Sequence, residues 1–309
     1  MEQTFMKEKK ILPLVLSMSL PMMLSMLVNS LYNIVDSYFV AQISEQAMTA
    51  LSLVYPLQLL ETAIAVGFGI GMNAAAAYYL GAKEQQRADD IVTSGLILSL
   101  LHGVILMAAA LLFAPAFVSL FTENEKILAE GVKYSNLVFI FAVPNVIAIT
   151  FEKIFQAEGR MKVSMLSMLC GCVANIILDP LLIFGIGIFP KMGIEGAAIA
   201  TGIGQVIPLI VYLFIFIKHP VSLHFHWHEK VFQKRLMGQM YGVGIPATLN
   251  LALPSFMITA LNGILAVYSA SYVLVLGIYY KLQTFIYLSA NGIVQGIRPI
   301  ISYNYGAGE

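Results

Sequence analysis

The sequence predicts an all-α integral membrane protein, a polytopic helical bundle. Of its 309 residues, 59% are hydrophobic and only 11% are charged, and the mean hydropathy is +0.83. Soluble domains carry about 25% charged residues, so this composition fits a chain whose solvent is mostly lipid. Apolar runs of the length that a membrane-spanning helix needs recur along the chain, and its beginning and end match each other. The formal net charge of zero gives no support for nucleic-acid binding.

Eight apolar runs are long enough to cross a hydrocarbon core about 30 Å thick. Alternation with period two is absent from them, which disfavours membrane-spanning strands. The first run follows Lys7, Lys9 and Lys10 but is longer than the apolar part of a signal peptide, so we interpret it as a spanning helix. The eight runs cover residues 12–39, 49–80, 91–115, 132–155, 163–187, 194–217, 237–261 and 271–304.

Basic residues predict which side of the membrane each loop faces. The N-terminal tail and the even-numbered loops contain twelve Lys and Arg residues, counting Lys153, and the odd-numbered loops contain three. The remaining two, Lys281 and Arg298, fall inside the eighth run. Because cytoplasmic loops carry the excess of basic residues, we expect the N-terminus to lie in the cytoplasm.

The chain matches itself without a gap at an offset of 225 residues. The sequence YPLQ at 55–58 pairs with YKLQ at 280–283, and LGAKE at 80–84 pairs with YGAGE at 305–309. The seventh and eighth runs therefore repeat the first and second. Six helices per unit is an even number, so both units begin on the same side, which predicts a parallel repeat with a pseudo-two-fold axis along the membrane normal.

The repeat predicts three segments. We expect a six-helix N-terminal lobe at 1–217, a cytoplasmic inter-lobe linker at 218–236, and the first two helices of a second lobe at 237–309. A complete second lobe would add four more helices. We therefore expect the sequence to be a truncated form of a twelve-helix protein.

Polar residues at helical spacing mark a candidate cation site. In the first run, Tyr32, Asn33 and Asp36 follow the three-to-four spacing of one helix face, and in the fifth run Asn175 and Asp179 are four apart. Ionisable residues inside spans are costly and are functional candidates by default. The alternative is that the two aspartates only hydrogen-bond neighbouring helices.

Thr201 and Gln205 form a similar polar stripe in the sixth run. If the stripes of these three helices converge, they make a pocket of carboxylate, carboxamide and hydroxyl oxygens. Two carboxylates in a low dielectric cannot both stay ionised cheaply, so such a pocket would hold a proton or a hard cation. For Asn175 and Thr201 taken alone, a role in linking helices is an equal alternative.

Two prolines lie near this pocket. Pro180 follows Asp179 and removes a backbone hydrogen bond, which would kink the helix and free a carbonyl. Pro21 lies well inside the first run and is either a hinge or a static kink.

Glu61 and Lys281 lie at similar depths in the second and eighth runs, which are partners in the repeat. We expect them to line the cleft between lobes, where they would form an inter-lobe pair or contact the substrate. Gln283 lies beside Lys281 and joins the same candidate set.

No catalytic motif is present, so an enzyme is not expected. Alternate histidines in HFHWH at 224–228 resemble a metal tract, but no Cys or acidic cluster lies beside them in the sequence. We therefore expect no metal site and no cofactor besides a coupling ion. The two cysteines, Cys170 and Cys172, point to different helix faces and are expected to be packing residues.

The chain resembles the multidrug and toxic compound extrusion (MATE) transporters, particularly the DinF-like and MepA-like bacterial branches. The resemblance covers essentially the whole chain. It depends on NSLYNIVDSYFV in the first run, YYLGAK after the second, NIILDPLLIFG in the fifth, GIEGAAIAT opening the sixth and QGIRPIISYNYGAGE closing the eighth.

The resemblance implies a twelve-helix, two-lobe antiporter of the bacterial inner membrane, monomeric when complete. It implies export of cationic amphipathic drugs against an inward flow of Na⁺ or H⁺, and the residues do not distinguish these two ions. The positions matching the DinF-like cation site are Asp36, Asn175, Asp179 and Thr201, with Tyr32 and Pro21 nearby. The acid that the NorM-like branch carries in its seventh helix has no counterpart in PATLNLALPS at 246–255.

Two other functions remain open. A flippase for lipid-linked precursors would line its cavity with several basic residues for a diphosphate, and only Lys281 and Arg298 qualify. The other alternative is a truncated fragment that does not transport.

Overall fold

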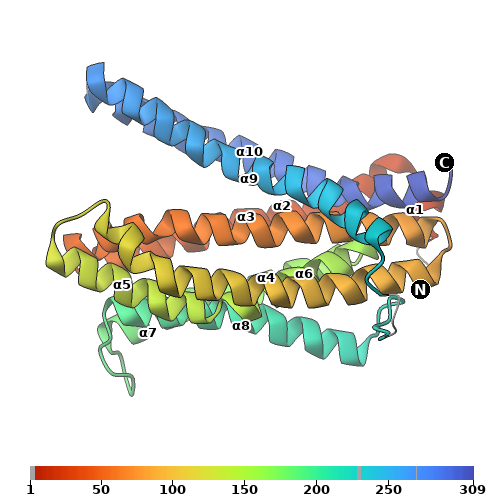
Figure 1. Cartoon of the computed structure of the whole chain (residues 1–309), viewed down its shortest axis with the longest axis horizontal. Coiled ribbons are helices and arrows are strands. Elements are labelled where there is room, and N and C mark those ends of the chain that lie inside the picture. The colour runs from red at the N-terminus through yellow and green to blue at the C-terminus, as the bar shows by residue number, and fades with distance from the viewer. Residues whose placement is uncertain (1–3, 228–230, 269) are drawn as a thin grey trace.

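The computed structural model describes residues 4–227, 231–268 and 270–309, and for part of the range 254–286 it describes only the backbone. Ten helices make up this part of the chain, nine of them long (Figure 1). They are α1 (Phe5–Glu8), α2 (Ile11–Ala41), α3 (Glu45–Gly81), α4 (Gln85–Ser119), α5 (Glu125–Ile140), α6 (Ala142–Ala157), α7 (Met161–Phe184), α8 (Ile194–Lys218), α9 (Lys234–Tyr268) and α10 (Ala270–Gly306).

Each of the eight predicted spans falls largely on observed helix, although the fifth extends three residues beyond the end of α7 at Phe184. Within the described residues, five helices are long and apolar enough to cross a membrane, and α5 with α6 makes a sixth if this bent pair is one span. Local signals explain several helix ends. Ser44 caps α3 by accepting from the Ala47 N–H at 3.0 Å, and Asn124 caps α5. Gly185 ends α7 with a φ of 75°, a conformation that favours glycine.

The predicted span over 132–155 consists of two helices. Helices α5 and α6 meet at Phe141 and are bent by 46°. Pro144 lies in the first turn of α6 and has no N–H to donate to the Ile140 carbonyl, which favours a break at this position. The predicted run passed over this proline because its apolar composition does not change there.

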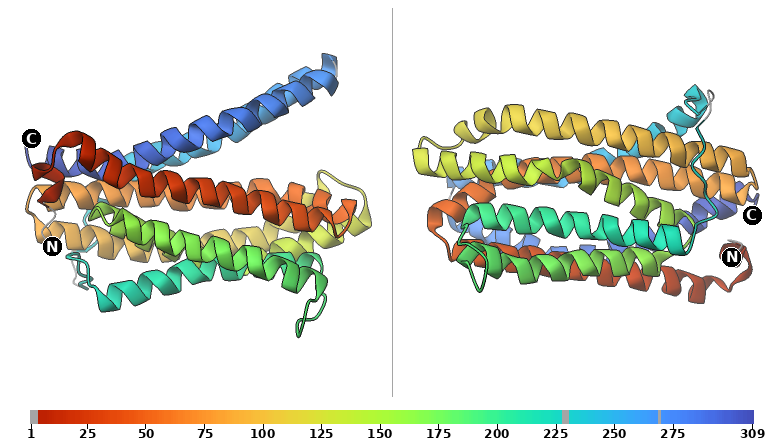
Figure 2. Two further views of the ribbon diagram at one scale, coloured as in Figure 1. Left: turned by 180° about the vertical axis from the view of Figure 1, so that it is seen from behind. Right: turned by 90° about the horizontal axis from the view of Figure 1, so that it is seen from below.

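Helices α2 to α8 form one bundle, and α9 and α10 pack against its α2–α3 side (Figures 1 and 2). The core of the bundle consists of apolar residues of α3, α4 and α6 at one end, and of α3, α5 and α8 at the other. In Figure 1, α9 and α10 lie close to the bundle near the chain termini and diverge from it at the opposite end.

The contacts of α9 and α10 repeat those of α2 and α3 crosswise. A Cβ atom added to Gly67 of α3 would meet Thr248 of α9, and one added to Gly292 of α10 would meet Met23 of α2. Gly67 and Gly292 differ by 225 positions, as do Met23 and Thr248. The reciprocal contact is that of a two-fold interface and confirms the predicted parallel repeat.

The described part of the segment between α8 and α9, residues 219–227 and 231–233, crosses one end of the bundle. Glu158 binds it there, because its Oε1 accepts from the Ser222 hydroxyl at 2.7 Å and from the Leu223 N–H at 3.1 Å. Helix α8 ends at Lys218 and α9 begins at Lys234, and the inter-lobe role of residues 218–236 stays a prediction.

Candidate functional site

A cavity of about 710 Å³ lies among α2, α3 and α5–α8, and Leu251 of α9 and Leu288 of α10 also reach it. The bundle of α2 to α8 therefore supplies most of its wall. The polar residues of that wall that matter below are Tyr32, Asp36, Gln58, Glu61, Tyr134 and Thr201.

Asp36 of α2 and Asp179 of α7 meet at this wall. Asp36 is 8% exposed and lines the cavity, whereas Asp179 is 0% exposed and lies behind it. Their carboxyl groups are close enough for one to hydrogen-bond the other when a proton lies between them. Asp36 Oδ1 has no hydrogen-bond partner among the described residues. The two aspartates predicted from separate helical stripes are thus neighbours.

Asn175 connects the aspartate pair to α8. In the orientation of its carboxamide that satisfies both ends, the nitrogen donates to Asp179 Oδ2 at 3.2 Å and the oxygen accepts from the Thr201 N–H at 3.2 Å. The Thr201 side chain is buried beside the same cavity. The structure therefore brings Asp36, Asn175, Asp179 and Thr201 into one cluster.

Three other side chains surround the cluster. Tyr32 and Asn33 lie four and three residues before Asp36 on α2, and both line the cavity. Sequence reasoning missed Tyr134 of α5, whose buried hydroxyl lies near Thr201 and Gln58 and close to Asp36. Tyr134 was missed because a tyrosine in a predicted span is not an ionisable candidate, and its polar neighbours Lys133, Ser135 and Asn136 lie at the end of that run.

Both prolines lie inside continuous helices. Pro21 is buried in α2, where its carbonyl oxygen accepts from the Ser25 hydroxyl at 2.8 Å. Pro180 lies inside α7, which continues to Phe184 without a break. The kink predicted at Pro180 thus does not interrupt the helix.

Glu61 lines the cavity and pairs with a residue that the sequence did not suggest. Its Oε1 accepts from Asn145 Nδ2 of α6 at 3.0 Å. The side chain of Lys281, its predicted partner, lies outside the described residues, so that pair stays a prediction. Gln283 is half-buried and is not among the residues of the cavity wall.

A buried ion pair also reaches the cavity. Lys153 of α6 is 2% exposed, and its Nζ lies 2.9 Å from Glu152 Oε1 and 3.1 Å from Gln156 Oε1. The interpretation of Lys153 as a residue of a cytoplasmic loop was wrong, because the helix continues beyond it and packs it inside. Without Lys153, the N-terminal tail and even-numbered loops still contain eleven basic residues against three in the odd-numbered loops, so the predicted cytoplasmic N-terminus is unchanged.

The cluster around Asp36 offers oxygens of carboxylate, carboxamide and hydroxyl groups in a site shielded from bulk water. Such oxygens are ligands for hard cations, and paired carboxylates also take a proton readily. Within the described residues, no Lys or Arg is paired with Asp36 or Asp179.

Comparison with known families settles what kind of protein has this architecture. The MatE family model matches residues 21–181, which is more than half of the chain. The chain belongs to the MatE family. The match contains all of α3 to α6 together with Asp36, Asn175 and Asp179.

Relatives of this MatE protein are multidrug export proteins. It is 28% identical over 306 residues to the multidrug export protein MepA of Staphylococcus aureus strain MRSA252, covering 98% of this chain and 67% of that protein. The MepA protein of Staphylococcus haemolyticus strain JCSC1435 shows the same identity and coverage. The chain thus spans about two thirds of the length of these relatives.

Solved structures share the fold. A transporter of the MOP superfamily from Pyrococcus furiosus superposes with a TM-score of 0.91 at 23% identity, over 99% of this chain and 68% of that one. A multidrug resistance MATE family transporter in an outward-facing conformation gives 0.89 at 23% identity, over 99% and 67%. The predicted family and the all-α membrane fold are confirmed.

Proposed function

We propose that the protein is a secondary active efflux antiporter that exports cationic amphipathic compounds in exchange for Na⁺ or H⁺. The observation that supports this most directly is the approach of Asp36 to Asp179 at the wall of the 710 Å³ cavity. Multidrug export is what the names of the MepA relatives state for those proteins. We place the protein in the bacterial inner membrane as a monomer.

The aspartate pair would bind the coupling ion. Asp36 faces the cavity and has a free carboxylate oxygen, and Asp179 is sealed behind it by the Asn175 amide. An ion entering from the cavity would therefore meet Asp36 first. It would be held between both carboxylates and would neutralise one of the two buried negative charges, which removes their mutual repulsion.

Charge around the cavity favours a cationic substrate. Among the described side chains of the wall, the acids are Asp36, Glu61 and Glu152, and the base is Lys153. Lys153 already pairs with Glu152, which leaves two carboxylates without a basic partner. Release of the coupling ion would restore the negative charge that attracts an organic cation.

The geometry fits a state that is open to the outside. Helices α9 and α10 pack on the bundle near the chain termini and diverge at the other end (Figure 1). If the N-terminus is cytoplasmic, as the loop charges predict, the contact between the lobes closes the cytoplasmic side. Alternating access would then require the glycine contacts there to separate.

The test is efflux of a fluorescent cationic dye from cells that produce the protein. We expect Asp36→Asn and Asp179→Asn each to reduce efflux to the level of cells without the protein. Glu195→Gln is the matched control, because Glu195 is a carboxylate that pairs with Lys133 at the surface. Each variant is first quantified in the membrane fraction, so that loss of the protein is distinguished from loss of transport.

Coupling is tested by repeating the efflux assay without sodium at fixed pH, and with a proton uncoupler. Loss of efflux without sodium assigns Na⁺, and loss with the uncoupler alone assigns H⁺. Full efflux by both aspartate variants would exclude the carboxylate pair as the coupling site. A flippase for lipid diphosphates is disfavoured by the same acidic wall, since a diphosphate needs basic partners.

A further inference from the structure

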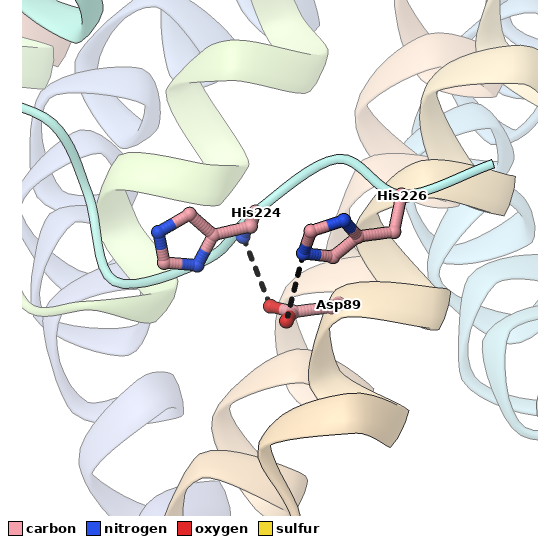
Figure 3. Close-up of side chains that lie close together, drawn as sticks. All are labelled: Asp89, His224 and His226. Atoms are coloured by element: carbon pink, nitrogen blue, oxygen red, sulfur yellow. Dashed lines mark hydrogen bonds and ion pairs between the residues drawn. The ribbon is translucent and has the colours of Figure 1, made fainter.

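Asp89 of α4 lies against two histidines of the segment between α8 and α9 (Figure 3). One ligand atom from each of Asp89, His224 and His226 lies within 4.8 Å of the other two. His226 Nε2 is 4.0 Å from Asp89 Oδ2, and the two imidazole rings have centroids 5.9 Å apart. Asp89 is 6% exposed, and both histidines are exposed. The sequence did not reveal this carboxylate because 135 residues separate it from His224.

Backbone hydrogen bonds hold the histidine segment on α4. The His224 N–H donates to Asp89 Oδ1 at 2.9 Å, and the His226 N–H donates to Thr93 Oγ1 at 3.1 Å. Gln85 Nε2 also donates to Asp89 Oδ1 at 2.9 Å. These bonds occupy one carboxylate oxygen and leave Oδ2 facing the His226 ring. Residues two apart in an extended segment point the same way, and Figure 3 shows both rings extending in the same direction beside Asp89.

We propose that Asp89, His224 and His226 bind one divalent transition-metal ion of the Zn²⁺ type. Two imidazole nitrogens and one carboxylate oxygen are a ligand set for such ions, and a water would complete a tetrahedron. Ligand atoms around a tetrahedral Zn²⁺ lie about 3.4 Å apart. The exposed imidazoles therefore need to close by about 1 Å, which small side-chain rotations achieve.

A bound ion would join the segment between the two lobes to helix α4 of the first lobe. Helix α4 belongs to the bundle of α2 to α8, and the histidines precede α9, which begins at Lys234. The metal would add a second attachment to the one that Glu158 makes with Ser222 and Leu223. It would thereby restrict the motion of this segment, which has to move together with α9 when the lobes change their relative position.

The experiment is calorimetric titration of the untagged, chelator-treated protein in detergent with Zn²⁺, and with Mg²⁺ as the control for nonspecific charge. We expect one Zn²⁺ per protein and no comparable Mg²⁺ binding. The variant His224→Ala/His226→Ala and the variant Asp89→Asn should each bind Zn²⁺ at least about tenfold more weakly. Asn at position 89 keeps an oxygen for the backbone hydrogen bonds, so the segment stays in place.

His219→Ala is the matched control, because His219 is an exposed histidine at the end of α8 outside the cluster. It should bind Zn²⁺ as the wild type does. Hydrogen exchange gives a second readout: Zn²⁺ should slow exchange in residues 221–227 of the wild type and not of the double histidine variant. Equal Zn²⁺ binding by wild type and double variant, or equal loss in His219→Ala, would overturn the site.

Discussion

Gly81 of α3 and Gly306 of α10 occupy equivalent positions on the two sides of one contact. A Cβ atom on Gly81 would meet the Tyr303 carbonyl oxygen, and a Cβ atom on Gly306 would meet the Tyr78 carbonyl oxygen. Gly81 and Gly306 are 225 positions apart, and so are Tyr78 and Tyr303. The absence of side chains thus lets the backbones of α3 and α10 approach closely, as small residues do between membrane helices.

We predict that Gly81→Val and Gly306→Val each destabilise the contact between the lobes. The added atoms meet backbone, which cannot turn aside as a flexible side chain does, so the cost should be about 1–3 kcal/mol or more. Gly242→Ala is the control, because nothing lies within 4 Å of a Cβ atom there. The measurement is the melting temperature in detergent. Equal melting temperatures for all three variants would contradict a close backbone contact.

We predict coupling between Glu61 and Asn145. Removing the Asn145 amide with Asn145→Ala leaves a buried carboxylate without its donor, at a cost of about 1–3 kcal/mol. In a Glu61→Gln background, the same change should cost less, because a neutral amide needs the donor less. Unfolding of the four proteins in a double-mutant cycle measures the difference. Additive effects would mean that the 3.0 Å contact contributes nothing.

The buried pair Glu152–Lys153 should behave as one unit. Lys153→Met leaves a buried carboxylate without its cation and is expected to cost about 3–5 kcal/mol. Lys153→Met combined with Glu152→Gln removes both charges and should recover most of that stability. Unfolding in detergent compares the variants. A double variant no more stable than Lys153→Met alone would count against a compensated ion pair.

Tyr134→Phe should weaken the response of efflux to the coupling ion while leaving the fold intact. The change removes only the hydroxyl near Gln58 and Thr201 and keeps the buried ring. We expect the concentration of coupling ion at half-maximal dye efflux to rise several-fold, since one hydrogen bond contributes about 0.5–1.5 kcal/mol. Tyr79→Phe, which loses its bond to Gln239 at 2.7 Å outside the cavity wall, is the control.

Glu158 should make stability depend on pH. Burial raises the pKa of its carboxyl above the ordinary value of 4.5, against hydrogen bonds from Ser222 and Leu223 that lower it. The folded protein therefore holds this proton to higher pH than the unfolded chain does. The stability it contributes is complete below about pH 4.5 and is lost as the pH rises through the folded pKa.

The comparison that isolates this contribution is the melting temperature of wild type minus that of Glu158→Gln across that pH range. The difference should fall as the pH rises. Glu45→Gln, at an exposed position in the first turn of α3, should show no such trend. A difference that rises with pH would show that the hydrogen bonds from Ser222 and Leu223 outweigh burial.

The helical stripes could be predicted from the sequence because spacing along one helix fixes which residues share a face. Asp36 with Tyr32, and Asn175 with Asp179, needed nothing beyond that spacing and the cost of polar groups in lipid. The partners across helices could not be predicted in this way. Asn145 lies among apolar neighbours and Tyr134 beside ordinary polar residues of a helix end, and only the rotation of α5 and α6 about their axes turns them toward Thr201 and Glu61.

The sequence by itself determined the membrane class, the places of the helices and the repeat at offset 225, because hydropathy and periodicity are local properties of the chain. Tertiary structure alone decided that Lys153 is buried beside Glu152 and that Asp89 lies below His224 and His226. Such pairings depend on how rigid helices pack over distances of many residues, and that packing is set by the summed contacts of whole surfaces.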